Sequence, residues 1–240
     1  MRLAVLLGLA ALPVFAAAVE ANSPAAPAAA YAPLKPFVAT YDVQRGGKTI
    51  GEATMTLKAD GGDRWTLVTQ TRGTAGMAKL FGLDVKEESH FTAAGQSPLQ
   101  STAYNFQQEA TLKSRQRRIE FDWTAKEARV TDKDELFRYP LQPYSIDRHA
   151  VVIALGRAQN LDQNTLQIAS KDAVESQRYE RRETQPLQLP AGRFEATRYE
   201  RADKPGKGSC WYTPELLAPL QVEQTQKDGA SILMRLRRVE

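Results

Sequence analysis

Apolar and polar side chains alternate along most of the chain. The first such segment, residues 37–44, has Phe, Ala, Tyr and Val at every second position. Because successive side chains of a β-strand point to opposite faces, this period of two predicts a strand with one buried face. The pair Gly46-Gly47 then predicts a hairpin turn, since glycine takes a positive φ without steric cost. Further strands from Ile50 and from Trp65, separated by a glycine-rich turn at 60–63, complete an antiparallel meander.

The same period returns in short segments up to the C-terminus. The remaining predicted strands are 84–91, 100–107, 112–123, 128–131, 136–139, 165–169, 174–183, 187–189, 193–201, 209–212, 220–226 and 231–239. Residues 73–82 have helical spacing and predict a short helix or an ordered loop with one apolar side. From Ile146 the apolar spacing changes to three and four, which predicts an α-helix over 146–155 or a little further. The expected fold is mainly β: a single curved antiparallel sheet or partly open β-barrel with one inserted α-helix and a short helical turn.

The first 36 residues differ from this pattern. A basic start, an apolar run over 3–18 and small residues after it are typical of a secretory signal peptide, so we assign residues 1–21 to one. An uncleaved anchor is the alternative, but the run is shorter than the roughly 20 residues that a membrane span needs. Residues 22–36, rich in Ala and Pro, predict a flexible linker, and residues 37–240 a single β-rich domain. The chain is therefore expected to be exported to the periplasm, without a transmembrane helix after cleavage.

Charge and cysteine content narrow the classes of partner. The chain has 32 Lys and Arg against 28 Asp and Glu, and this net charge of +4 is too small to indicate a nucleic-acid partner. Cys210 is the only cysteine, which excludes an intrachain disulfide and zinc sites built from cysteines. Since it stands beside Trp211 in a strand-like segment, we expect Cys210 to be a small buried apolar residue.

Few residues suggest catalysis. The two histidines, His90 and His149, have no metal-binding partner at helical spacing, and we expect them at the surface or at a helix end. The chain has no Gly-x-Ser-x-Gly turn and no phosphate-binding loop. We therefore expect a protein that is not an enzyme, with no catalytic residues, metal site or cofactor. A hydrolase with a dispersed site stays open, and it requires a cleft where His90 or His149 meets a serine and a carboxylate.

One predicted strand combines charge and apolarity on a single face. Every second residue from 113 to 117 is cationic, and every second residue from 119 to 123 is apolar. An amphiphile with an acidic head and a hydrocarbon tail would meet a complementary surface there. The candidate ligand-binding residues are Lys113, Arg115, Arg117, Ile119, Phe121 and Trp123. Two structural alternatives stay open: the strand extends beyond the core with its basic end in solvent, or a bulge exchanges the two faces.

Two groups of motifs resemble known families. The opening strand Phe37-x-Ala39-x-Tyr41-x-Val43, the glycine hairpin, and Tyr139-Pro140-Leu141 before a helix near Asp147 resemble the exported proteobacterial family of domain of unknown function 3108. That resemblance implies an exported β-rich protein and assigns no activity. The run 210–229, with its Trp-x-x-Pro corner and Asp-Gly hairpin, is similar to the closing segment of periplasmic lipoprotein-carrier and receptor folds. In those folds a curved antiparallel sheet holds a helical plug over an apolar cavity.

These observations favour a non-enzymatic periplasmic binding protein for a hydrophobic or amphiphilic ligand, such as a lipid or an acyl chain. The alternative is an interaction or structural module of the cell envelope with a packed core. Such a module would bind a protein partner or an anionic glycan through its basic strand faces. An enclosed apolar cavity larger than a few waters would distinguish the first from the second.

Overall fold

A single sheet runs through the chain in the computed structural model, which describes residues 31–111, 114–226 and 228–240. The predicted signal peptide, residues 22–30 of the predicted linker, and Lys113 lie outside the described residues. The strands are β1 (Phe37–Arg45), β2 (Lys48–Gly61), β3 (Arg64–Gly73), β4 (Asp84–Thr92), β5 (Gln100–Glu109), β6 (Arg115–Asp122), β7 (Glu127–Asp132), β8 (Glu135–Pro140), β9 (Ile146–Asp147), β10 (Gln163–Ala169), β11 (Val174–Leu189), β12 (Gly192–Arg201), β13 (Gly208–Tyr212), β14 (Gln221–Thr225) and β15 (Ser231–Val239). Their order in the sheet is β8-β7-β6-β5-β4-β3-β2-β1-β15-β14-β13-β12-β11-β10-β9.

The predicted fold class is confirmed, because this sheet is curved, not closed, and antiparallel except at β9. Nearly every predicted strand corresponds to an observed one. The predicted strands 174–183 and 187–189 are wrong as separate elements, since β11 runs through both. A bulge between Arg181 and Thr184 skips residues there without ending the ladder to β12. The helical spacing in 73–82 corresponds to α1 (Gly76–Leu80).

The central helix begins later than predicted. Residues 146–147 form β9, which pairs in parallel with the end of β10, and α2 spans Val151–Arg157. The carboxylate of Asp147 accepts backbone N–H bonds from His149 at 2.9 Å and Ala150 at 3.0 Å. This side chain holds a turn after β9, and the helix starts only where that turn ends.

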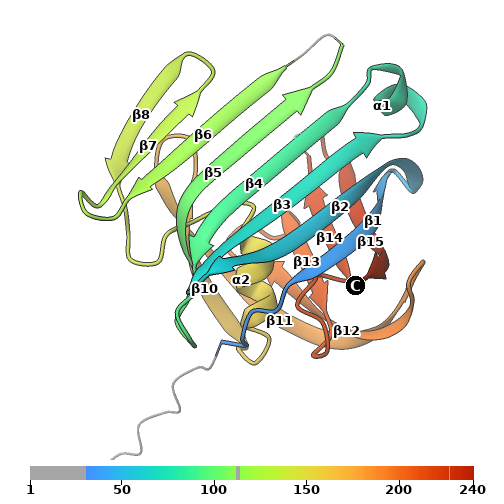
Figure 1. The fold of residues 1–240 in the computed structure, drawn as a ribbon. Coiled ribbons are helices and arrows are strands. Elements are labelled where there is room, and N and C mark those ends of the chain that lie inside the picture. The colour runs from blue at the N-terminus through green and yellow to red at the C-terminus, as the bar shows by residue number, and fades with distance from the viewer. Residues whose placement is uncertain (1–30, 112–113, 227) are drawn as a thin grey trace, which may run out of the picture.

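The sheet curls on itself to form a ring. Its middle pairs the first strand with the last, with Tyr41 of β1 opposite Leu236 of β15. On the far side the backbone N–H of Ser101 in β5 donates to the carbonyl of Ser145, just before β9, at 3.1 Å. Strands β1–β5 and β9–β15 therefore make a ring, which we define by these strands, and α2 lies inside it (Figure 1).

The ring is filled. The buried side chains of α2, including Ile153 and Leu155, form one cluster with the inner faces of the surrounding strands. The hydroxyl of Tyr212 donates to the carbonyl of Val152 in α2 at 2.7 Å. A Cβ on Gly156 would lie 2.7 Å from the carbonyl oxygen of Leu217, so this close approach requires glycine. The lipoprotein-carrier resemblance implied a helical plug over an apolar cavity, whereas here buried side chains occupy the space around α2.

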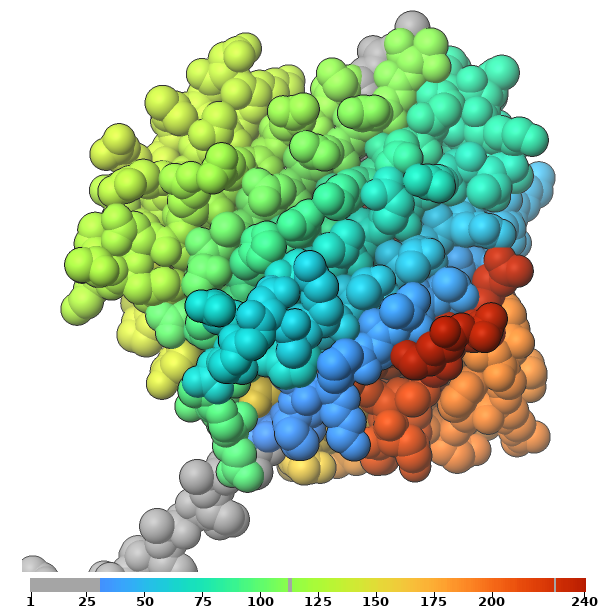
Figure 2. Space-filling view, viewed as in Figure 1, coloured from blue at the N-terminus to red at the C-terminus, as the bar shows by residue number. Residues whose placement is uncertain are grey.

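Strands β6–β8, which we call the wing, continue past the point where the ring closes. They pack on the outer face of β10, because Ile168 belongs to the ring cluster while its neighbour Ala169 belongs to a second cluster with the wing. The Tyr139 hydroxyl of β8 donates to the carbonyl of Ser170 at 2.9 Å. The sheet is thus a spiral whose end overlaps its own outer surface. The outer faces of the successive strands form one side of the molecule (Figure 2).

Candidate binding groove

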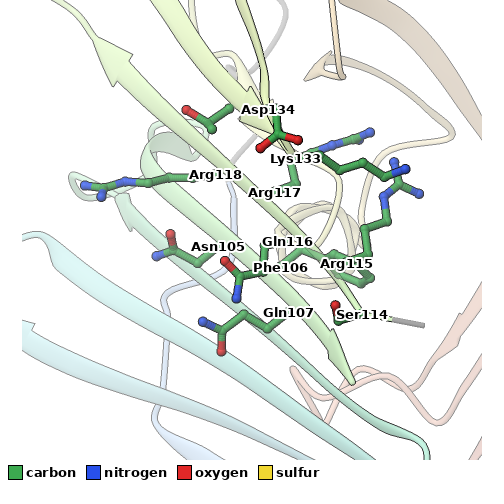
Figure 3. A pocket seen from close by; sticks show the side chains of 11 residues that line it. Asn105, Phe106, Gln107, Ser114, Arg115, Gln116, Arg117, Arg118, Lys133 and Asp134 are labelled. Atoms are coloured by element: carbon green, nitrogen blue, oxygen red, sulfur yellow. The ribbon is translucent and has the colours of Figure 1, made fainter. Parts of the chain in front are cut away.

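The predicted amphipathic face of β6 exists and points inward. Arg115, Arg117, Ile119 and Phe121 are the more buried residues of this strand, and the residues between them are more exposed. No bulge interrupts the pairing of β6 with β5 or β7, so the parity holds along the strand. Figure 3 shows this alternation at the N-terminal, basic end of β6, where Arg115 and Arg118 lie on opposite sides of the strand.

Two arginines of this face share a single carboxylate. Asp132 lies opposite Arg117 in the β6–β7 ladder, and only 4% of its side chain is exposed. Its Oδ2 accepts from Nη2 of Arg117 at 2.7 Å and from Nη2 of Arg115 at 3.1 Å. Burial raises the pKa of Asp132, but the hydrogen bonds from Arg117 and Arg115 outweigh it and lower the pKa to about 2. The carboxylate is therefore ionised at neutral pH, and the group of three keeps one net positive charge.

These arginines line an open groove of about 640 Å³ (Figure 3). Residues from both faces of the sheet line it: Phe106, Arg115 and Arg117 have the inward parity, whereas Asn105, Gln107, Gln116, Arg118 and Thr131 have the outward parity, and Ser114, Lys133 and Asp134 complete the lining. Phe106 is the apolar element, and it stands directly opposite Arg117 in the β5–β6 ladder. The Nε of Arg117 is buried and has no hydrogen-bond partner among the described residues. The groove thus places two arginines that share one carboxylate beside an aromatic residue.

The apolar half of the predicted face is not part of the groove. Ile119 and Phe121 are buried in the second cluster, beneath the β10–β11 connection. Trp123 stacks on Phe121 with ring centroids 6.4 Å apart, and its indole N–H donates to the carbonyl of Ser101 at 2.7 Å. Of the predicted binding residues, the structure therefore brings Arg115 and Arg117 to the groove. It places Ile119 and Phe121 in the core, with Trp123 partly buried against them. Lys113 lies outside the described residues.

A third arginine adjoins the groove from inside the ring. The guanidinium carbon of Arg148 lies 4.8 Å from the centroid of Phe106, and Nη2 donates to Oε1 of Glu87 at 2.8 Å. Burial raises the pKa of Glu87, but the charges of Arg148 and His149 and the hydrogen bonds from Tyr104 and Arg148 together hold the pKa below its usual value. Arg148 also lines a hollow of about 230 Å³ at the mouth of the ring, beside Val151 and Val222.

Asp132 and Arg148 were not predicted from the sequence, for different reasons. Asp132 had a detectable signal, because folding 112–123 onto 128–131 about the intervening turn places it opposite Arg117. Arg148 had none, since its partner Glu87 is 61 residues away and only the closure of the ring brings them together.

The histidine, serine and carboxylate that a hydrolase would need do meet, but in the core. Ser89 lies 2.9 Å from Nδ1 of His149 and donates to Asp147 at 2.7 Å. The other imidazole nitrogen contacts Thr69 at 2.8 Å, so the carboxylate holds the serine rather than the imidazole. Ser89 and Asp147 are fully buried, and neither they nor His149 line the hollows described above. His149 does stand before the helix, as predicted, but in the core and not at the surface. This arrangement ties the two sides of the ring together and offers no substrate access to the hydroxyl.

The fold and groove define a mainly β protein: a spiral antiparallel sheet around a helix, with a basic groove at the wing. The chain belongs to the family of proteins of unknown function DUF3108, whose family model matches residues 40–237, and this confirms the resemblance seen in the sequence. No curated protein matches the chain. Within the described ranges, neither helix has the length and apolarity needed to cross a membrane.

Two solved structures are similar to this chain. One is a β-barrel-like protein of domain of unknown function DUF1849 from Brucella abortus, with 12% identity and a TM-score of 0.46 over 88% of this chain and 99% of the other. The second is a putative exported protein with a YmcC-like fold from Bacteroides fragilis, with 14% identity and a TM-score of 0.31 over 89% of this chain and 100% of the other.

Proposed function

We propose that this chain is an exported, non-enzymatic binding protein that holds an amphiphile with an acidic head group in the basic groove. The observation that carries the proposal is the pair Arg115 and Arg117, which share one carboxylate beside the ring of Phe106. The signal-like residues 1–21 support export. Since the ring is filled, the ligand would bind in the groove and not inside a barrel.

The chemistry of the groove suits an oxyanion attached to an apolar group. Guanidinium groups recognise carboxylates and phosphates through two parallel hydrogen bonds, and Asp132 uses only part of the donors that Arg115 and Arg117 provide. The remaining positive charge lies close to an aromatic face, which accepts the first part of an apolar tail. The volume of about 640 Å³ is within the range of small-molecule sites.

Oleate and oleyl alcohol test the proposal, because they share a chain and differ in charge. Isothermal titration calorimetry is expected to show that the native chain binds oleate more tightly than the alcohol. Arg115→Gln with Arg117→Gln should raise the Kd for oleate about tenfold or more, since each charge-assisted bond is worth about 1.5–3 kcal/mol. The same change should leave the weak binding of the alcohol unaltered.

Two further variants make this result interpretable. Removing both arginines leaves Asp132 as an unpaired buried charge, so Asp132→Asn is added to the pair and circular dichroism checks the fold. The matched control is Arg138→Gln, an exposed arginine of β8 outside the groove, which should bind oleate like the native chain. Equal oleate affinity in the native chain and the triple variant would refute the proposal.

The filled ring also favours a second candidate, the envelope module that binds an anionic glycan. Such a polymer needs only an open basic surface, and the groove is open. The test is retention of the native chain on immobilised polygalacturonate, which high salt should abolish because ions screen exposed charges. Retention that the triple variant loses, together with no oleate binding, would select this candidate over the amphiphile.

A further inference from the structure

The short helix α1, between β3 and β4, presents large apolar side chains to solvent. Met77 is 61% exposed and Leu80 is 71% exposed. They stand three positions apart, so they occupy the same side of the helical turn. Single exposed apolar side chains are common on protein surfaces. Two exposed apolar side chains next to each other on one short helix are typical of a contact surface.

The backbone fixes α1 in this position. The N–H groups of Thr74 and Ala75 donate to the carbonyl of Ile50 at 3.0 and 3.3 Å. The helix lies so close to the sheet that a Cβ on Gly73 would be 2.4 Å from the carbonyl oxygen of Ala78. The exposure of Met77 and Leu80 is therefore built into the fold, because the other side of the turn is docked on β2 and β3.

Two lysines belong to the elements that carry and support this apolar pair. Lys79 belongs to α1, and Lys48 begins β2, on which α1 packs; neither has a carboxylate partner among the described residues. The neighbouring pairs Arg45–Asp228 and Arg72–Asp84 are neutral as units. Glu52, opposite Arg72, pairs with Arg237, and Glu109, opposite Asp84, is a further carboxylate.

The same rim leads to the basic groove. The carbonyl of Phe81, just after α1, accepts from the backbone N–H of Thr111 at 2.9 Å. Thr111 lies in the connection from β5 to β6, and the groove begins a few residues later at Ser114. In Figure 1, α1 lies between the β1–β2 turn and the end of β5.

We propose that this rim docks on an anionic membrane surface. Met77 and Leu80 enter the boundary between head groups and acyl chains, while Lys48 and Lys79 face the acidic head groups. Apolar insertion and attraction of basic residues to anionic lipid are the two contributions that hold peripheral proteins on membranes. The inference goes beyond the proposed function, because it names the surface from which an acidic amphiphile would reach the groove.

Vesicle co-sedimentation tests the docking, with vesicles of phosphatidylcholine alone and of phosphatidylcholine mixed equally with phosphatidylglycerol. The native chain is expected to bind the mixed vesicles more tightly. Met77→Asp with Leu80→Asp should lower the partition coefficient at least about tenfold, since two apolar insertions are lost. Lys48→Gln and Lys79→Gln should each lower it about fivefold on mixed vesicles only.

Leu136→Asp is the matched control, because Leu136 is 77% exposed on β8, outside this rim. It should bind both kinds of vesicle like the native chain. Native-like binding by the Met77 and Leu80 double variant would overturn the inference, as would absence of native binding to either vesicle. Self-association of the vesicle-free chain that the double variant abolishes would assign the rim to a second copy instead.

The membrane-docking inference and the proposed binding function can be refuted independently of each other. The groove variant with Arg115, Arg117 and Asp132 neutralised should still bind mixed vesicles while losing oleate. The Met77 and Leu80 double variant should still bind oleate in solution.

Discussion

His149 is a residue whose titration the fold should control. Its imidazole lies between Thr69 and Ser89, at 2.8 and 2.9 Å. Burial lowers its pKa below the usual value, Glu87 and Asp147 partly oppose this, and the charge of Arg148 adds to it. The unfolded chain therefore binds this proton more readily than the folded chain. Its contribution to stability is fully present above the ordinary value of about 6.5 and is lost as the pH falls below it.

We expect the free energy of unfolding to decrease between about pH 7 and pH 5 because of this one residue. Urea denaturation across that range measures the slope. His149→Asn should flatten the slope, even though it lowers stability at every pH by disturbing the Ser89 and Thr69 contacts. His90→Gln is the control, since His90 lies on the other face of β4 and contacts Thr66 and Glu88. A full slope in the His149 variant would contradict the assignment.

At the scale of elements, Arg157 connects the end of α2 to two segments without regular structure. It is buried, and its guanidinium donates to the carbonyls of Ala32 at 2.7 Å, Gly95 at 2.9 Å and Ser97 at 2.9 Å. The backbone N–H of Ala32 donates back to the carbonyl of Arg157 at 2.8 Å. Residues 31–36, which belong to the predicted flexible linker, thus begin with a segment fixed to the helix.

Arg157→Met keeps the apolar stem and removes every donor. Three carbonyls then lose a hydrogen bond from a charged donor, and such a bond is worth about 1.5–3 kcal/mol. We expect a loss of at least about 3 kcal/mol in the free energy of unfolding, measured by urea denaturation. Arg138→Met, at an exposed position of β8, should change stability by no more than about 0.5 kcal/mol. Equal effects of the two substitutions would show that the carbonyl contacts contribute little.

The sequence predicts helices and strands well where local residues determine them, and poorly where contacts distant in the sequence determine them. Alternation in 37–44 and in 231–239 depends on each strand alone, so β1 and β15 were found. Their pairing at the middle of the sheet joins the two ends of the domain, and no local pattern encodes it. The start of α2 was missed because it depends on hydrogen bonds of the Asp147 side chain, which identity and spacing do not specify.

The same distinction applies to the candidate site. The parity of β6 correctly oriented Arg115 and Arg117, because strand geometry alone decides it. Strand parity does not predict that Ile119 and Phe121 are buried, because they pack against Ala169 and Val174, about 50 residues later in the sequence. Whether the apolar half of β6 is free to bind a hydrocarbon chain therefore depends on the spiral arrangement of the sheet, which local sequence does not encode.

At the scale of the whole molecule, the spiral divides the core into two clusters that meet across β10. Ile168 packs inward on α2, and Ala169 packs outward on the wing. Each cluster has its own buried aromatic residues, so the wing and the ring need not lose their structure together. A charge introduced between the wing and β10 should separate them, because a buried unpaired carboxylate costs several kcal/mol.

Ala169→Asp introduces this charge. Hydrogen–deuterium exchange followed by mass spectrometry measures which strands and helices lose protection as a result. We expect amide exchange in β6–β8 to accelerate at least about tenfold, while α2 and the β1–β2 pair keep their protection. Thr165→Asp is the matched control, because Thr165 has the same outward parity on β10 but is exposed. It should leave exchange in the wing unchanged. If Ala169→Asp accelerates exchange equally in α2 and in β6–β8, the spiral unfolds as a single unit and the two clusters are thermodynamically one core.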